Sequence, residues 1–166
     1  YGGYYGGAGT IYLKDNAQSR GDLIVDNSMV ASGLYTRLMT GLTAFRSMTL
    51  RNWGWLGPVS TDMAAVTVDQ PMELTNGAGL ELGNGVTFTV TNGTGFDVSV
   101  RSGSTVTLDA GSVLSANAVQ VSGGTLNTNV DLAFPNGSDF ELSSVGVVNV
   151  LSGRTLSLGT FDGTNV

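Results

Sequence analysis

The chain has 166 residues, which is enough for one domain with a continuous core; glycine supplies 25 of them, and charged residues make up only 12%. The net charge of −6, with seven dispersed basic residues, argues against nucleic acid and anionic membrane surfaces as partners. Histidine and cysteine are absent, which excludes disulfides, thiolate or histidine catalysis and cysteine-type zinc sites; no apolar run reaches the roughly 18 residues of a transmembrane helix.

Residues 1–9 (YGGYYGGAG) form a lead rich in glycine and tyrosine. Such a segment has too few side chains to offset the entropy lost on ordering, so one interpretation is a flexible linker. The other is an adhesive or self-associating arm, in which Tyr1, Tyr4 and Tyr5 offer aromatic faces for stacking. These three tyrosines are therefore candidates for an interaction surface.

Residues 10–47 are predicted to form N-terminal strands and a cap region, with strands at 11–13 and 23–25. In the part from 28 to 46, four apolar residues recur at helical spacing: Leu34, Leu38, Leu42 and Phe45. This spacing favours a helix across the end of the fold, but Gly33 and Gly41 weaken it, and an irregular first coil fits equally. In either case we expect this region to cover strand edges that would otherwise aggregate.

From residue 48 to residue 166 the sequence repeats a triplet of apolar, polar and apolar residues. The clearest series is Met48-Thr49-Leu50, Met72-Glu73-Leu74, Val98-Ser99-Val100, Val119-Gln120-Val121 and Phe140-Glu141-Leu142. Successive triplets begin 24, 26, 21 and 21 residues apart. Alternation of period two buries one face of each short strand, and the recurrence lets each strand stack on its counterpart in the next coil.

Two further columns of strands accompany this series. One runs through 80–82, 106–108, Leu126 and 148–150, and the other through 66–68, 86–90, 113–114, 130–134 and 156–158. The predicted fold class is therefore all-β: a right-handed parallel β-helix (β-solenoid) with about three strands per coil over 48–166. Asn-Gly and Ser-Gly pairs supply the turns, and because they also favour hairpins, an antiparallel sandwich is the competing fold. The nearly constant spacing favours the solenoid.

Several segments carry a family resemblance: GVTFTVTNGTG (85–95), RSGSTVTLDAGSVLSA (101–116), VSGGTLNTNV (121–130) and VNVLSGRTLSLG (148–159). They resemble coils of bacterial extracellular and surface parallel β-helix proteins, such as adhesins and autotransporter passengers. The resemblance implies export to the cell surface and a scaffolding or adhesive role. Because the chain begins at Tyr1 rather than Met, we also expect it to be a piece of a longer product.

Catalysis would have to rely on carboxylates, and the candidates are Glu73, Asp97, Asp109 and Glu141, with Arg101. Glu73 and Glu141 are predicted to lie three coils apart at about 4.8 Å per step. This is farther than the separation of about 5–9.5 Å that glycosidases use. The calcium-binding nonapeptide repeat is also missing its aspartates. We therefore expect no enzyme activity, no cofactor and no metal.

An aromatic patch is predicted near the N-terminal end, where Trp53 and Trp55 lie close in sequence to Leu56 and could meet Tyr35. Exposed aromatic platforms bind sugars or protein partners, which makes the two tryptophans candidates for an interaction surface. The alternative is that one tryptophan packs under the N-terminal cap.

These observations predict a structural or adhesive extracellular module, secreted or on the cell surface. Because both ends of a solenoid present unpaired strands, we expect it to associate with itself, end to end or by exchange of its N-terminal strand, into filaments. A polysaccharide or a host surface is a further possible partner. The alternative function is that of a carbohydrate-active β-helix enzyme or a carbohydrate-binding module.

Overall fold

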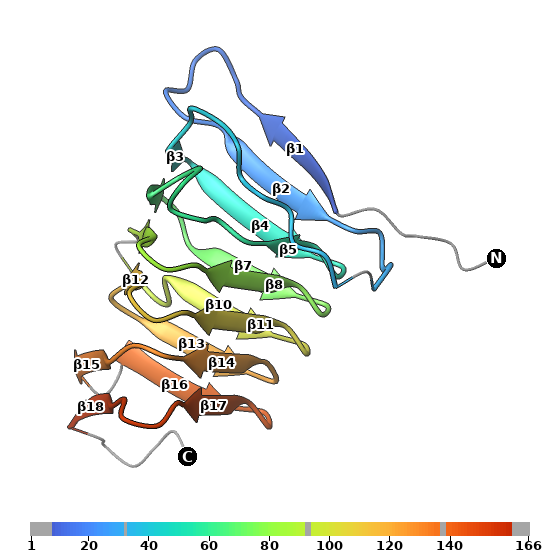
Figure 1. The fold of residues 1–166 in the computed structure, drawn as a ribbon. Helices are drawn as coiled ribbons and strands as arrows, with labels where there is room; N and C mark the ends of the chain where they lie inside the picture. The colour runs from blue at the N-terminus through green and yellow to red at the C-terminus, as the bar shows by residue number, and fades with distance from the viewer. Residues whose placement is uncertain (1–7, 32, 92–93, 137–138, 161–166) are drawn as a thin grey trace.

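The computed structural model describes residues 8–31, 33–91, 94–136 and 139–160 and has the predicted architecture, a parallel β-solenoid (Figure 1). Each turn of the chain places one strand directly beside the corresponding strand of the turn before. Between named strands of the described ranges the pairing is parallel, with the exception of β1 and β2. An antiparallel sandwich is therefore excluded.

The longest sheet has seven strands in the described residues, in the order β1-β2-β4-β7-β10-β13-β16. Its strands are Gly9–Leu13 (β1), Asp22–Asp26 (β2), Ser47–Arg51 (β4), Met72–Thr75 (β7), Val98–Arg101 (β10), Val119–Ser122 (β13) and Phe140–Ser143 (β16). The five triplets of the sequence are thus five neighbouring strands. Parallel stacking also extends before residue 48, because β2 pairs with β4.

Two more columns of strands complete each coil. The second sheet contains Trp55–Leu56 (β5), Gly79–Leu82 (β8), Thr105–Leu108 (β11), Thr125–Thr128 (β14) and Val147–Val150 (β17). The third contains Ala44–Phe45 (β3), Ala65–Val68 (β6), Thr87–Val90 (β9) and Val113–Ser115 (β12), while Leu132–Asn136 (β15) and Leu156–Thr160 (β18) form a separate pair. The third predicted column is therefore interrupted, because β12 and β15 do not pair with each other in the described residues.

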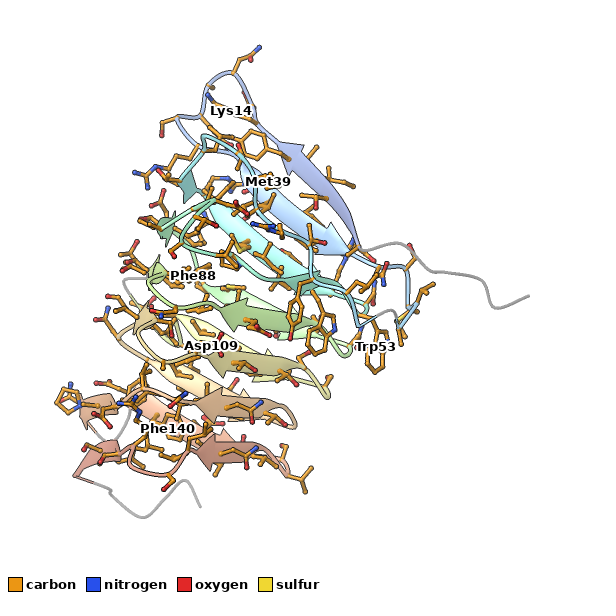
Figure 2. All side chains as sticks on the ribbon, viewed as in Figure 1. Lys14, Met39, Trp53, Phe88, Asp109 and Phe140 are labelled. Atoms are coloured by element: carbon orange, nitrogen blue, oxygen red, sulfur yellow. The ribbon has the colours of Figure 1, made fainter. Side chains whose placement is uncertain are left out.

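The interior is built from vertical files of like residues. The pairing places Met72 beside Val98 and Leu74 beside Val100, and all four side chains are at most 1% exposed. Phe88, inside the third column, is also fully buried (Figure 2). Each such side chain contributes about 1.5–3 kcal/mol by leaving water, so the repeat of the triplet is the main source of stability.

One member of these files does not fit the prediction. Leu142 continues the file of Leu50, Leu74, Val100 and Val121, which are completely buried, but it is itself 41% exposed. It lies on β16, which is the last strand of its sheet in the described part of the chain. With no strand beyond β16 in those residues, one side of Leu142 faces solvent.

The helical alternative for the N-terminal region is wrong. Residues 28–31 and 33–46 contain no helix; Thr36 forms a single parallel bridge with Leu56, and β3 follows at Ala44. The leucines at helical spacing do not share a buried face, because Leu38 is 5% exposed whereas Leu34 is 52% exposed. The positive φ of Gly33, +63°, breaks the helical path.

The turns from the first sheet to the second share one form in most coils. Their central residues have positive φ, as in Asn76-Gly77 (54° and 74°) and Ser102-Gly103 (49° and 73°). The amide of the fourth turn residue donates to the carbonyl three residues earlier, from Ala78 to Thr75 and from Ser104 to Arg101. This left-handed pair explains these Asn-Gly and Ser-Gly pairs, whereas the turn from β13 to β14 has Gly123 alone in that conformation.

Candidate functional site

The two tryptophans lie at the edge between the first and second sheets, where each ring covers a glycine of the next coil. Trp53 is a turn residue with a φ of +62°, and its ring lies over Gly77 (Figure 2). Trp55 starts β5, lies over Gly79, and donates from Nε1 to the carbonyl of Gly77 at 3.1 Å. A Cβ on Gly79 would come within 2.9 Å of the Trp55 ring, so these glycines are required by the rings.

The predicted patch is smaller than expected. Tyr35 does meet Trp55, edge to face, with ring centroids 5.0 Å apart and an interplanar angle of 75°. Leu56 does not belong to the patch, because it points into the core and is completely buried. Trp53 is 38% exposed. Tyr1, Tyr4 and Tyr5 lie outside the described residues, so their role stays a prediction.

The carboxylates considered for catalysis are dispersed. Glu73 and Glu141 are separated by Ser99 and Gln120 in the same file, which is three strand steps. Glu73 pairs with Arg101 at 2.9 Å, and Glu141 accepts from the Gln120 amide at 2.9 Å. Both carboxylates thus make contacts to neighbouring coils on the outer face of the first sheet.

Asp97 is in a different environment, because it is buried to 1% exposure. Its carboxylate accepts a hydrogen bond of 2.5 Å from the backbone amide of Asn117, and its own amide donates to the carbonyl of Ala118. These contacts join the loops that lead into β10 and β13. The side chain therefore holds two adjacent coils together.

A second group of polar residues gathers around Tyr35, on the second sheet. The Tyr35 side chain lies near Glu81 of β8: burial first, and then this carboxylate, raises the pKa of Tyr35. Asp109 follows β11, one coil further, and burial and the charge of Glu81 raise the pKa of its carboxyl group. Sequence analysis could not identify Glu81 as part of this group, because only the stacking of coils brings it close to Tyr35, 46 positions earlier.

The two ends of the solenoid are apolar. At the N-terminal end, β1 covers the edge of β2, and Ile11, Leu13 and Met39 are between 52% and 74% exposed. Figure 2 shows Met39 in the N-terminal part of the stack, near the Lys14 loop. In the last described coil, Val147 and Leu151 are each 45% exposed and Leu142 is 41% exposed. Several apolar side chains therefore face solvent at each end.

No group of three or more acidic residues in the described ranges is arranged to hold a metal ion. Over the same residues, no helix is long and apolar enough to span a bilayer. Comparison of the chain with models of protein families, with curated proteins and with solved structures finds no match.

Proposed function

We propose that this chain is a structural and adhesive β-solenoid module of a bacterial extracellular surface protein, and that it joins further coils end to end. The observation that carries the proposal is the exposure of Leu142. Val100 and Val121, which precede it in the same file, are 0% exposed, whereas Leu142, in the last described coil, is 41% exposed. Apolar surface of this kind becomes stable when another coil covers it.

The sides of the solenoid fit a rod that presents a polar surface. Outward positions of the stacked strands carry threonine, serine, asparagine and glutamine, for example Thr49, Thr107 and Gln120, rather than many charges. Because each coil contacts only its neighbours, adding coils lengthens the rod without altering its core. The extracellular location rests on the resemblance of the coils to those of bacterial surface proteins.

A second copy of the chain is the partner that best fits the open end. The first sheet has a free edge at β1 and another at β16 in the described residues. β1 has five residues and β16 has four, so backbone hydrogen bonds between them would join two copies into one continuous sheet. Tyr12 of β1, which lies on the same face of the sheet as the buried Leu23, would supply an apolar contact to Leu142. Such an association is heterologous and does not close, so it produces filaments.

Sedimentation velocity over a range of protein concentrations, combined with negative-stain microscopy, tests this proposal. We expect a series of species that lengthens with concentration and has the width of one molecule. The variant Leu142→Arg places a charge at the open end and should shift assembly to at least about tenfold higher concentration, because a buried unpaired charge costs several kcal/mol.

The matched control is Thr87→Arg, which adds the same side chain to the exposed first position of β9, away from both ends of the solenoid. This variant should assemble like the unmodified chain. A monomer at every concentration, or equal effects of Leu142→Arg and Thr87→Arg, would show that the end of the solenoid does not mediate association.

A further inference from the structure

A pocket of about 320 Å³ lies on the side of the solenoid, away from both ends. Successive coils build it: Gly57 follows β5, Glu81 and Asn84 come from β8 and the turn after it, and Asp109 follows β11. Tyr35 and Arg37 of the N-terminal region complete its walls. The volume is at the lower limit of the roughly 300–1,000 Å³ of small-molecule sites. Asp109 lies on this side face in Figure 2.

The aromatic wall of the pocket is held in place before any ligand arrives. Tyr35 packs against Gly57, where a Cβ would come within 3.1 Å of the tyrosine side chain. Trp55 contacts it edge to face, with ring centroids 5.0 Å apart. Tyr35 is nevertheless 38% exposed. A fixed, half-exposed tyrosine ring is the kind of surface against which the apolar face of a sugar packs.

The carboxylates of Glu81 and Asp109 have no ion pair among the described residues. Other acids there are engaged, such as Asp26 by Arg51 and Asp97 by the Asn117 amide. Burial first, and then the like charge of Glu81, raises the pKa of Asp109.

Among the described residues that line the pocket, the one cation, Arg37, does not neutralise these two carboxylates. Arg37 is engaged by Asp62, with Nη2 at 2.6 Å and Nε at 2.8 Å from the same carboxylate oxygen. The pocket therefore keeps two acidic groups, Glu81 and Asp109, without a cationic partner among the described residues. A ligand that brings a positive charge and several hydroxyl donors would satisfy both groups.

We propose that this pocket binds an amine-bearing saccharide unit, packed on Tyr35, with its ammonium group and hydroxyls donating to Asp109 and Glu81. The Asn84 amide, at the rim of the pocket, can both donate to and accept from a ring hydroxyl. Binding involves no covalent step, and it is independent of the end-to-end association proposed above.

The test is a titration of the isotopically labelled chain, followed by nuclear magnetic resonance at fixed pH and ionic strength. The probes are a β-1,4-linked glucosamine tetramer, its N-acetylated counterpart and the polyamine spermidine. We expect saturable shifts at Tyr35, Glu81 and Asp109 with the glucosamine tetramer. Binding of the two other probes should be at least about tenfold weaker, because one lacks the charge and the other lacks the rings.

Three variants locate the site. Asp109→Asn and Glu81→Gln should each weaken binding of the tetramer by about tenfold or more, because each removes a charged hydrogen bond. The matched control Glu73→Gln removes the same charge from the first sheet and should leave the affinity unchanged. Thermal unfolding shows whether each variant is folded, and shift mapping on the unmodified chain locates the ligand without any variant.

Four results would overturn the proposal. They are no binding of the tetramer, shifts centred away from Tyr35, equal binding of spermidine or of the N-acetylated tetramer, and an equal loss of affinity in Glu73→Gln. Equal binding of spermidine would reduce the site to a general attraction for cations, and equal binding of the N-acetylated form would remove the role of the amine.

Discussion

Ser104 occupies the last turn position before β11, at the place that Ala78 takes one coil earlier. Both residues are completely buried, and both amides close the same turn. The Ser104 hydroxyl, however, has no hydrogen-bond partner within the part of the chain that the structure describes. A buried hydroxyl without a partner carries the full cost of its lost hydration.

We therefore predict that Ser104→Ala stabilises the fold by about 1 kcal/mol, because it removes that unpaired group and leaves the methyl group found in Ala78. Chemical denaturation measures the change. The reverse substitution, Ala78→Ser, should destabilise the fold by about 1–3 kcal/mol. A loss of stability in Ser104→Ala would mean that the hydroxyl makes a stabilising contact.

In contrast to the unpaired Ser104 hydroxyl, the Asp26 carboxylate has several hydrogen-bond donors. The Ser28 amide donates to its carboxylate at 2.8 Å, and Arg51 and Asn52 donate from the next coil. The Ser28 hydrogen bond first, and then the Arg51 and Asn52 contacts, lower the pKa of Asp26 below its ordinary value of 3.8, against an opposing effect of burial. Because the pKa is lower in the folded state than in the unfolded state, the ionised carboxylate stabilises the fold above pH 3.8.

The prediction is that Asp26→Asn destabilises the fold at pH 7 by roughly 0.5–1 kcal/mol, a small value because the group is near the surface. The difference should shrink as the pH falls from 3.8 through the lower pKa of the folded state, since the carboxylate is then protonated in both states. Denaturation at pH 7 and at strongly acidic pH measures it. A difference that stays the same at both would show that ionisation of Asp26 is irrelevant.

At the scale of the turn, two coils depart from the rule that glycine follows the first left-handed residue: Trp53 takes this position between β4 and β5, and Val145 takes it between β16 and β17. The turn between β16 and β17 has Ser144 and Val145, with φ values of 50° and 59°, where other coils have Gly77 or Gly103. Valine is β-branched and strained in this conformation, at a cost of about 1–2 kcal/mol. Its side chain is 94% exposed, so in the described structure packing does not offset this strain.

We predict that Val145→Gly raises stability by about 1 kcal/mol by relieving this strain. The converse variant Gly103→Ala isolates the same backbone effect, because nothing lies within 4 Å of the added Cβ. It should lower stability by a similar amount. Thermal and chemical unfolding of both variants check the pair, and an unchanged Gly103→Ala would contradict the conformational argument.

At the scale of the strand, the sequence predicted what local alternation encodes. The triplets identified the parallel strands from β4 to β16 because each keeps one apolar face. The antiparallel direction of β1 was not predictable, since alternation is the same in either direction. The lack of pairing between β12 and β15 was also not predictable from the sequence, because it depends on the path of the loops between columns rather than on the strands themselves.

The side pocket could not be read from the sequence for a related reason. Trp55 and Tyr35 were recognised as a possible pair, because aromatic residues are conspicuous. Glu81 and Asp109 are ordinary turn and strand residues until the stacking places them in adjacent coils. Their significance lies in the missing ion-pair partner, which only the arrangement of neighbouring side chains reveals.

At the scale of the whole molecule, the polar contacts between coils change along the rod. Coils near the N-terminal end are joined by ion pairs such as Arg46 with Asp22 and Arg51 with Asp26. Further along, neutral side chains form ladders, for example from Asn149 to Asn127 at 2.8 Å. Common to both regions is the in-register stacking of the coils, on which the core, the open end and the side pocket all depend.

That stacking can be measured directly as a distance between spin labels, because the chain has no cysteine of its own. Thr49 and Glu141 face outward in the same file, four strand steps apart through Glu73, Ser99 and Gln120. Spin labels on cysteines introduced at Thr49 and Glu141 should give one narrow distribution of distances centred at about 19 Å, four times the strand spacing of about 4.8 Å. A broad distribution, or a mean displaced by more than one strand spacing, would contradict the stacked solenoid.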